Sequence, residues 1–319
     1  YTAAESAGKA GLSVLLIEKN NLGGVCLNEG CIPTKTLLYS AKTYDSAKHA
    51  SKYAINVSEV SFDLSKIIVR KSKVVRKLVL GVKAKLASNN VAIVSGEAQI
   101  IDKNTVRCGE ETYEGENLIL CTGSETFIPP IPGVETVNYW THRDALDNKE
   151  LPASLAIVGG GVIGMEFASF FNSLGVQVTV VEMLDEILGG MDKELSALLR
   201  AEYAKRGIKF LLSTKVVGLS QTEGGAVVSY ENAEGSGNVV AEKLLMSVGR
   251  RPVTKGFGLE NLNLEKTERG AVKVDEKMQT SVPGVYVCGD LTGFSLLAHT
   301  AVREAEVAVH SIPIRRLPG

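Results

Sequence analysis

A glycine-rich turn between two apolar strands is the feature that most constrains how this chain can fold. Residues 154–182 read SLAIVGGGVIGMEFASFFNSLGVQVTVVE: a short apolar strand, a glycine turn, a segment with small residues on one helical face, and a second apolar strand. This order predicts a βαβ unit, in which a helix joins two parallel strands. We therefore expect an α/β fold with a parallel sheet.

The start of the chain repeats this unit. At an offset of 164 residues, Glu18 at the end of VLLIE aligns with Glu182 at the end of VTVVE, and Gly11 aligns with Gly175. The same offset places the glycine turn before the first residue of the chain. We therefore expect the natural protein to begin at least about ten residues earlier, with a strand and a turn of normal length.

Length and charge exclude several classes of function. A chain of 319 residues is long for one hydrophobic core, so two or three domains are expected. Its 35 basic and 36 acidic residues give a net charge of −1, and no basic run is interleaved with aromatic residues. No window reaches the roughly 18 apolar residues of a membrane helix, and no signal-peptide pattern opens the chain. We expect small-molecule partners, no nucleic acid, no membrane and an intracellular location.

The glycine turn has the spacing of a dinucleotide site. Gly159, Gly161 and Gly164 form a GxGxxG pattern between a strand and a helix, and Glu182 stands 21 residues beyond the second of them. The glycines allow a tight turn and the close approach of a pyrophosphate, and the carboxylate can accept hydrogen bonds from ribose hydroxyls. Glu182 would repel a 2′-phosphate and Met183 supplies no cation, which favours NAD over NADP. The alternative is a glycine turn without a ligand.

Carboxylates end two other apolar strands. By the repeat, Glu18 is expected on the ribose of a second adenine dinucleotide, with a solvated carboxylate as the alternative. The strand VYVCGD ends at Asp290, and LLAH at 296–299 begins a helix. The carboxyl ends of strands are where open α/β sheets bind ligands. Two dinucleotide sites in one chain indicate an electron relay.

Two closely spaced cysteines in the segment GGVCLNEGCIPTK are expected to carry the chemistry. Four residues that include Gly30 separate Cys26 from Cys31, which lets their Cα atoms come within disulfide range. Pro33 suits the first turn of a helix, so Cys31 is expected at a helix N-terminus, where the dipole favours a thiolate. A redox-active disulfide is the favoured interpretation. The alternatives are a zinc site, for which no second Cys or His pair stands nearby, and two unrelated buried cysteines.

An ion pair is predicted beside this segment. Lys35 follows the second cysteine by one helical turn and Glu166 follows the glycine turn, so the two are expected to meet, with a surface role for each as the alternative. The other three cysteines, Cys108, Cys121 and Cys288, lie in or beside apolar strands. They are expected to be ordinary buried thiols.

Local patterns predict the remaining elements. Helices are expected over 33–49 and 64–89 and from about His299, and strands within 91–121 and over 209–212, 227–230, 243–248, 272–275 and 285–289. A proline cluster at 129–132 marks a crossover. The end, PIRRLPG, fits neither strand nor helix.

With these motifs, the chain resembles the dihydrolipoamide dehydrogenase family of pyridine nucleotide–disulfide oxidoreductases over residues 1–312. GGVCLNEGCIPTK is the specific signature, and CTGS, GGGVIGME, SVGRRP and the VCGD and LLAH segments support it. The resemblance implies two Rossmann-like dinucleotide-binding domains in a three-layer α/β architecture. An FAD-binding domain would cover 1–148, without its first strand and glycine turn, an NAD-binding domain would cover 149–271, and 272–319 would return to complete the FAD-binding domain.

The resemblance also implies the site residues. Catalytic roles would fall to Cys26, Cys31, Lys35 and Glu166. FAD contacts would come from Glu18, Gly24, Lys35, Ala98, Thr122, Gly123, Ser124, Asp290, Leu296, Leu297, Ala298 and His299. NAD contacts would come from Gly159, Gly161, Val162, Ile163, Gly164, Glu166, Glu182, Val216 and Gly249. No metal is implied.

The implied reaction is the oxidation of protein-bound dihydrolipoamide. Cys26 would exchange with the substrate thiols, Cys31 would contact the flavin as a thiolate, and the electron pair would pass through FAD to NAD. The partner would be a lipoyl-bearing protein of a 2-oxo acid dehydrogenase or glycine-cleavage complex, in the bacterial cytoplasm or the mitochondrial matrix. Alternatives are glutathione or mercuric reductase, which use NADPH, and a non-catalytic dinucleotide-binding module.

The sequence departs from the family pattern at its end. The family has a further C-terminal domain, which forms the homodimer and supplies a His–Glu acid/base pair across the interface, and this sequence does not contain it. The chain alone is therefore expected to lack a complete active site.

Overall fold

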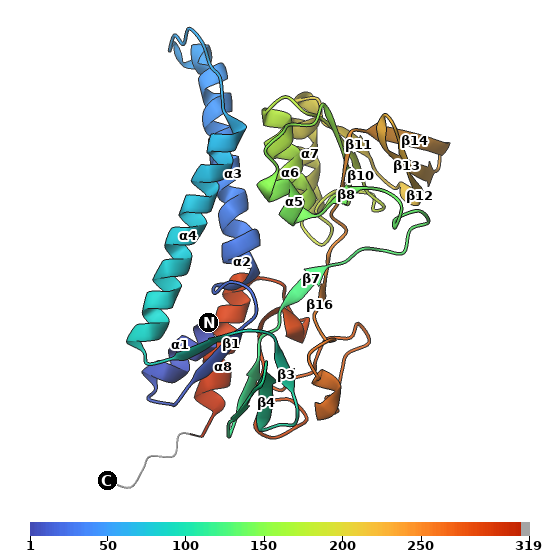
Figure 1. Cartoon of the computed structure of the whole chain (residues 1–319). Helices are drawn as coiled ribbons and strands as arrows, with labels where there is room; N and C mark the ends of the chain where they lie inside the picture. The colour runs from blue at the N-terminus through green and yellow to red at the C-terminus, as the bar shows by residue number, and fades with distance from the viewer. Residues whose placement is uncertain (314–319) are drawn as a thin grey trace. The chain divides into compact units, whose positions relative to one another are not determined.

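The computed structural model describes residues 1–313 of the chain, which form an α/β fold in two compact units. Unit 1 comprises residues 1–28, 76–125 and 250 onward, and unit 2 comprises residues 29–75 and 126–249. Figure 1 shows the helices and strands of each unit. The expected division by cofactor into 1–148, 149–271 and 272–319 stays a prediction.

Unit 2 is built on a five-stranded parallel sheet in the order β11-β10-β9-β15-β8. Its strands are β8 Tyr139–Trp140, β9 Ser154–Val158, β10 Gln177–Val181, β11 Lys209–Leu211 and β15 Lys243–Met246. The helix α6, Val162–Ser173, connects β9 to β10. The predicted βαβ unit is therefore confirmed, and β9 lies at the centre of the sheet because it pairs with both β10 and β15.

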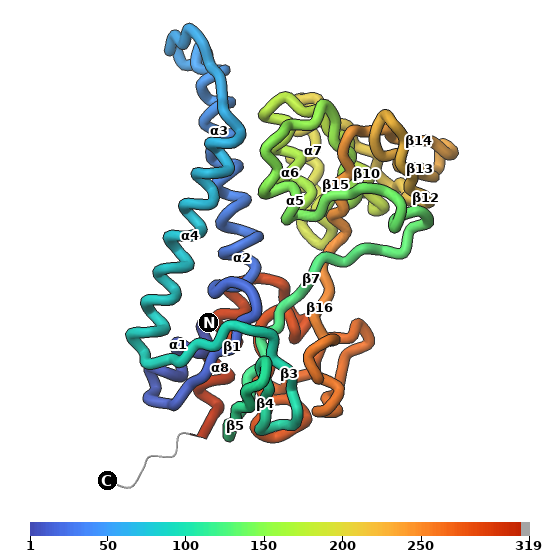
Figure 2. The backbone as a smooth tube through the Cα atoms, in the orientation of Figure 1, coloured from blue at the N-terminus to red at the C-terminus, as the bar shows by residue number. Residues whose placement is uncertain are grey.

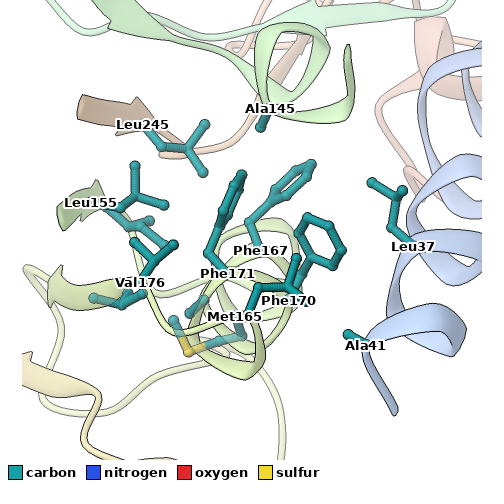
Figure 3. Packing of buried hydrophobic residues seen from close by; sticks show 14 of the residues in the cluster. Leu37, Ala41, Ala145, Leu155, Met165, Phe167, Phe170, Phe171, Val176 and Leu245 are labelled. Atoms are coloured by element: carbon teal, nitrogen blue, oxygen red, sulfur yellow. The ribbon is translucent and has the colours of Figure 1, made fainter. Parts of the chain in front are cut away.

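Helices cover one face of this sheet. They are α3 Cys31–Lys48, the first part of α4 Leu64–Ser88, α5 His142–Asp147, α6, and α7 Lys193–Lys205, with the 3₁₀ turn η1 Ala50–Tyr53 after α3. Figure 3 shows the packing, in which Leu37 of α3 lies beside the phenylalanines of α6. Phe167, Phe170 and Phe171 are each about 1% exposed, and burial of such side chains contributes about 1.5–3 kcal/mol each. The predicted helices 33–49 and 64–89 are both present.

A three-stranded antiparallel sheet covers the other face of the unit 2 sheet. It consists of β12 Lys215–Thr222, β13 Gly225–Asn232 and β14 Gly235–Ala241. Alternation along β9 explains the layering, since Leu155 and Ile157 pack with the helices while Ala156 and Val158 pack with the antiparallel sheet. This gives the predicted three layers. Only β13 was expected from the sequence, because glycines and polar residues interrupt the apolar pattern of β12 and β14.

Unit 1 contains two parallel strand pairs and an antiparallel sheet. The pairs are β1 Leu15–Glu18 with β2 Ala92–Ser95, and β6 Leu118–Leu120 with β17 Val285–Val287. The antiparallel sheet is β3 Ala98–Ile100, β4 Thr105–Cys108 and β5 Glu111–Glu114. The helices α1 Thr2–Lys9 and α8 Ala298–Ser311, from opposite ends of the described chain, lie side by side (Figure 2). Shorter elements are α2 Gly24–Glu29, β7 Ser124–Thr126, β16 Arg250–Pro252, η2 Leu259–Leu262 and η3 Gly289–Thr292.

The predicted strand at 272–275 is wrong: Val272 makes only an isolated bridge to Lys266, and its fully buried side chain packs in the core of unit 1 instead. Apolar residues that look like a strand can thus be buried in an irregular segment. Of the terminal PIRRLPG, residues 314–319 lie outside the described residues.

Candidate functional site

The two cysteines of the signature segment form a disulfide at the start of a long helix. Cys26 lies in α2, and Cys31 is the first residue of α3 with Gly30 as its N-cap. Both are disulfide-bonded, while the other three cysteines of the chain are free, so the two are joined to each other as predicted. The zinc alternative fails because both thiols are used in this bond. Reduction would release the Cys31 thiolate at a helix N-terminus, where the dipole stabilises it.

A carboxylate between the two cysteines is held by α5, which the sequence did not predict. Arg143 donates from Nε and Nη2 to the two oxygens of Glu29 at 2.5 and 2.7 Å. Nε2 of the buried His142 lies 3.7 Å from Glu29 Oε1, and its Nδ1 lies 3.1 Å from Thr126 Oγ1. Burial alone would raise the pKa of Glu29, but the interactions with His142 and Arg143 outweigh it and lower the pKa to about 2. The segment that carries the disulfide is therefore anchored by a charged, bidentate contact.

The predicted ion pair between α3 and α6 is present. Lys35 Nζ donates to Glu166 Oε1 at 2.5 Å. The Lys35 side chain is 60% exposed and that of Glu166 is 22% exposed. Since exposed pairs contribute little stability, the effect of this pair is to fix where the ammonium group lies, one turn from Cys31.

The three glycines of the turn after β9 have different structural requirements. Gly159 has φ +106°, and a Cβ there would lie 2.2 Å from the Ser247 carbonyl oxygen at the end of β15. A Cβ on Gly164 would lie 2.2 Å from the Gly159 carbonyl oxygen. Gly161 is the N-cap of α6, with an ordinary φ of −72°, and a Cβ there would meet nothing within 4 Å. The fold requires the outer two glycines, whereas the middle one leaves open space over a helix N-terminus that has no side-chain cap.

The carboxylate at the end of β10 lies against this turn. Glu182 accepts hydrogen bonds from the backbone N–H of Gly160 at 2.5 Å and of Leu184 at 2.8 Å. Gly249, which follows β15, has φ +120° and open space around its Cβ position. The carboxyl ends of β9, β10 and β15 therefore meet at one edge, as expected for a ligand site in a parallel sheet.

The remaining residues of the predicted NAD set lie in this unit too. Val162 and Ile163 form the first turn of α6, and the Val162 side chain is exposed. Val216 lies in β12 at a bulge and packs in part against the core beneath the antiparallel sheet. Direct contact of these residues with a dinucleotide stays a prediction.

In unit 1 a polar network joins the segments that follow β6 and β17. Ser124 Oγ donates to Asp290 Oδ2 at 2.5 Å and lies 2.8 Å from Arg250 Nε. Arg250 also donates to the Ser124 carbonyl oxygen at 2.6 Å. Thr122 Oγ1 donates to the Val253 carbonyl oxygen at 2.9 Å. The structure thus brings the predicted residues Ser124 and Asp290 together, and it adds Arg250, which the sequence marked only as part of the motif SVGRRP.

The other predicted FAD residues are spread over several elements of this unit. Glu18 ends β1 and accepts a hydrogen bond from the Asn20 N–H at 2.8 Å. Gly24 and Gly123 have φ of +71° and +70°. Ala98 begins β3, and the exposed residues Leu296, Leu297, Ala298 and His299 form the start of α8.

Glu304, a buried carboxylate near Asp290, was not among the residues that the sequence predicted. Glu304 of α8 accepts hydrogen bonds from the Gly289 N–H at 2.6 Å and from Thr292 Oγ1 at 3.4 Å. Burial raises the pKa of Glu304, and the nearby Asp290 adds to this effect, although both hydrogen bonds oppose it. Its spacing from the strand VYVCGD gives no local signal, because the contact depends on how α8 packs. This carboxylate fixes the turn that presents Asp290.

The expectation that all three free cysteines are ordinary buried thiols is wrong for Cys121. Cys108 and Cys288 are buried as expected, but Cys121 is exposed. The Sγ atoms of Cys121 and Cys288 lie 3.2 Å apart. These two are therefore not separate, ordinary buried thiols.

Known proteins similar to this chain form a coherent group. The family described as pyridine nucleotide-disulphide oxidoreductase matches residues 1–305. A dihydrolipoyl dehydrogenase of Geobacillus stearothermophilus is 38% identical over 317 residues, covering 98% of this chain and 67% of that protein. One of Acholeplasma laidlawii is 41% identical over 317 residues, covering 98% of this chain and 92% of that protein.

A solved structure of another flavoprotein is also similar to nearly the whole chain. The Cu(II) complex of the HOCl-induced flavoprotein disulfide reductase RclA from Escherichia coli has a TM-score of 0.83 and 31% identity, over 96% of this chain and 67% of that one. Within residues 1–313, none of the helices has the length and apolar character needed to cross a membrane.

Proposed function

This chain belongs to the pyridine nucleotide–disulphide oxidoreductase family, and we propose that it carries the redox centre of a dihydrolipoyl dehydrogenase. The substrate is protein-bound dihydrolipoamide, which is oxidised to lipoamide. The observation that carries the proposal is the Cys26–Cys31 disulfide at the N-terminus of α3. The name dihydrolipoyl dehydrogenase on both relatives above supports this choice of substrate.

The cysteines perform two thiol–disulfide exchanges. One substrate thiolate attacks the Cys26 sulfur, the Cys26–Cys31 bond breaks, and Cys31 leaves as a thiolate. The second substrate thiolate then attacks the sulfur joined to Cys26, which closes the lipoyl disulfide and releases Cys26 as a thiol once it gains a proton. The substrate loses two electrons and two protons, and the cysteine pair gains the two electrons. The N-terminus of α3 stabilises the Cys31 thiolate during this step.

FAD and NAD are the cofactors of this reaction. When bound, FAD supplies the two-electron link between the dithiol and the nicotinamide. The network Ser124–Asp290–Arg250 and the glycines with positive φ in unit 1 fit the holding of FAD, together with Glu18 and the start of α8. The Lys35–Glu166 pair would fix a positive charge near the flavin edge.

The glycine turn of unit 2 fits the pyrophosphate of NAD. Gly161 is not required by the fold, yet it leaves space in front of free N–H groups at the start of α6. Glu182 lies beside the same turn. Its carboxylate would accept hydrogen bonds from the ribose hydroxyls and would repel a 2′-phosphate. NAD is therefore favoured over NADP, and a glutathione or mercuric reductase activity is disfavoured.

Partners and location follow from the same proposal. The dehydrogenase acts as a homodimer on the lipoyl-bearing protein of a 2-oxo acid dehydrogenase or glycine-cleavage complex, and the acid/base pair for the substrate thiols is contributed across the dimer interface. It works in the bacterial cytoplasm or the mitochondrial matrix.

The test uses the natural full-length protein and two pairs of substrates. We expect turnover with dihydrolipoamide and NAD and little with NADPH and glutathione disulfide. Cys26→Ser and Cys31→Ser should each reduce lipoamide turnover by at least about a thousandfold, because each removes half of the exchanging pair. Cys108→Ala, at a buried thiol away from this segment, is the matched control and should retain activity.

The absorbance spectrum separates the enzyme from a non-catalytic binding module. A yellow protein that gains a long-wavelength charge-transfer band on partial reduction has the Cys31 thiolate against a flavin. A protein that stays colourless with added FAD, or that turns over only NADPH and glutathione disulfide, would overturn the proposal.

A further inference from the structure

The ends of two neighbouring parallel strands in unit 1 place a second pair of sulfur atoms together. The strands β6 and β17 pair in register up to Leu120 and Val287, and Cys121 and Cys288 directly follow the two strands. The Cys288 N–H donates to the Leu120 carbonyl oxygen at 3.1 Å, which continues the ladder to this point. Adjacent strands lie about 4.8 Å apart, within the Cα separation of roughly 4.4–6.8 Å that a disulfide allows. The backbone therefore needs no large movement to bridge these two residues.

The side chains are already turned toward each other. Cys121 Sγ and Cys288 Sγ lie 3.2 Å apart, close enough for one thiol to donate a hydrogen bond to the other sulfur. Cys288 is 3% exposed and packs with Ala3, Ala7 and Ala305 between α1 and α8. This apolar packing fixes the orientation of the Cys288 side chain toward Cys121.

The two sulfur atoms are chemically unequal. The hydrogen bond between the two sulfur atoms lowers the pKa of Cys121, whereas the same bond and burial raise the pKa of Cys288. Cys121 is thus the better thiolate and Cys288 the better proton donor. A pair with one nucleophilic and one protonated member is the arrangement that peroxide-sensitive dithiols use.

We propose that Cys121 and Cys288 form a second dithiol–disulfide couple, separate from Cys26–Cys31 and closed by hydroperoxides. In the first step the Cys121 thiolate attacks one oxygen of hydrogen peroxide. The O–O bond breaks, water leaves after protonation, and Cys121 becomes a sulfenic acid. In the second step the Cys288 sulfur attacks the Cys121 sulfur. The S–S bond forms, the S–O bond breaks, and the Cys288 proton leaves with the hydroxyl group as a second water. The two cysteines lose two electrons in total and the peroxide gains them.

The proposal is independent of the lipoamide activity. It depends only on the two strand ends and on an oxidant that is small enough to reach Cys121. Cys121 and Cys288 directly precede the segments that carry Ser124 and Asp290, so the bond would form beside that polar network.

The test is peptide mapping of the natural full-length protein, purified with its cofactor. The protein is reduced, freed of reductant, exposed to hydrogen peroxide, alkylated and digested with trypsin and Glu-C. This digestion gives residues 117–125 and 278–303 as separate peptides, each with one cysteine, and separates Cys108 from Cys121. We expect a joined species with the summed mass of both peptides less two hydrogens, which dithiothreitol splits.

Matched variants show which cysteines are required. The joined peptide should persist in Cys108→Ala and in a Cys26→Ser/Cys31→Ser double variant, which excludes exchange with the first pair. It should disappear in Cys121→Ala and in Cys288→Ala. Mapping of the wild-type protein decides the question even if the buried Cys288→Ala variant folds poorly.

Two results would overturn the proposal. In one, both cysteines remain fully alkylated after peroxide treatment. In the other, Cys121 advances to sulfinic or sulfonic acid and no joined peptide forms. Because the readout is a mass and not turnover, a failure of the proposed dehydrogenase activity would leave this result interpretable.

Discussion

Glu18 and Glu182 stand at equivalent positions of the two repeated units and make the same local contact. Each carboxylate accepts a hydrogen bond at 2.8 Å from the backbone N–H two residues later, at Asn20 and Leu184 respectively. A second strand of each unit is also followed by a glycine with positive φ. In unit 1 this glycine is Gly123, after β6, and in unit 2 it is Gly249, after β15. The two units thus share their backbone plan at the edge where dinucleotides are proposed to bind.

The units differ in what holds that edge together. In unit 2, β9 pairs with both of its neighbours, and backbone atoms pack directly on the glycine turn, with Ser247 O near Gly159 and Gly159 O near Gly164. In unit 1 as described, β6 and β17 form a separate pair, and side chains join the segments after them through Ser124–Asp290 and the two thiols. The backbone contacts at the glycine turn of unit 2 and the side-chain contacts after β6 and β17 in unit 1 should therefore respond to different mutations.

The largest effect is expected from Gly164→Val in unit 2. The new Cβ would lie 2.2 Å from the Gly159 carbonyl oxygen, which cannot move without disturbing the turn. A clash with backbone should lower the free energy of unfolding by about 3 kcal/mol or more. Denaturant unfolding at equilibrium measures this loss. A variant as stable as the wild type would show that backbone packing does not hold this edge.

Gly161→Ser separates ligand binding from stability. The φ of −72° suits any residue, the Cβ position is open, and serine is a good N-cap. We expect stability within about 0.5 kcal/mol of the wild type and NAD affinity reduced by about tenfold to a hundredfold, since the side chain fills the space for the pyrophosphate. Calorimetric titration with NADH and denaturant unfolding on the same sample test both halves. Unchanged affinity would contradict the assignment of this turn.

Glu18→Gln and Glu182→Gln form a matched pair across the two units. Each replacement keeps an oxygen that can accept the local N–H and removes only the charge. Glu182→Gln should narrow the preference for NADH over NADPH by about tenfold and leave FAD retention unchanged, while Glu18→Gln should weaken FAD alone. Dissociation constants for the three cofactors provide the measurement. If both variants affected the same cofactor, the two edges would not be separate sites.

The sequence predicted those elements and site residues that depend on local sequence patterns. The strand–turn–helix of 154–182, the helices 31–48 and 64–88, and the Cys26–Cys31 pair all depend on residues a few positions apart. Contacts that join distant segments, such as Glu29–Arg143 and Cys121–Cys288, left no such signal because they depend on tertiary packing. Lys35–Glu166 was the exception, since each residue lies at a fixed distance from a recognisable motif.

The contact between Arg143 and Glu29 tests whether a side-chain interaction also stabilises unit 2. Arg143→Ala should lower the free energy of unfolding by roughly 1 kcal/mol at neutral pH, because the pair is partly exposed. The pKa of Glu29 is lowered to about 2 in the folded protein. The ionised Glu29 carboxylate therefore stabilises the fold above the pKa of about 4.3 that it has in the unfolded chain. This stabilisation is lost as the pH falls toward 2.

The difference between wild type and Arg143→Ala should accordingly shrink as the pH falls below about 4.3. Unfolding curves at several pH values between 3 and 7 measure it. Arg251→Ala, which breaks an exposed pair with Glu125, is the control and should change stability little. A constant difference across the pH range would mean that Arg143 acts through packing and not through the Glu29 charge.

The smallest effect is expected from Glu304→Gln, beneath the edge of unit 1. Burial raises the pKa of Glu304 above its ordinary value. Stability from the protonated form is therefore fully present below the unfolded pKa of about 4.3 and is lost as the pH rises through the folded value. Glutamine keeps an acceptor for the Gly289 N–H and cannot ionise, so at neutral pH we expect equal or slightly greater stability, by less than about 1 kcal/mol. The free energy of unfolding should also depend less on pH between pH 4 and 8 than that of the wild type, as measured by unfolding curves.

Glu306→Gln, on the exposed side of the same helix, is the control and should leave the pH dependence of stability unchanged. A variant that loses stability at neutral pH would show that the ionised carboxylate itself holds the turn before Asp290, and that charge as well as hydrogen bonding organises this edge.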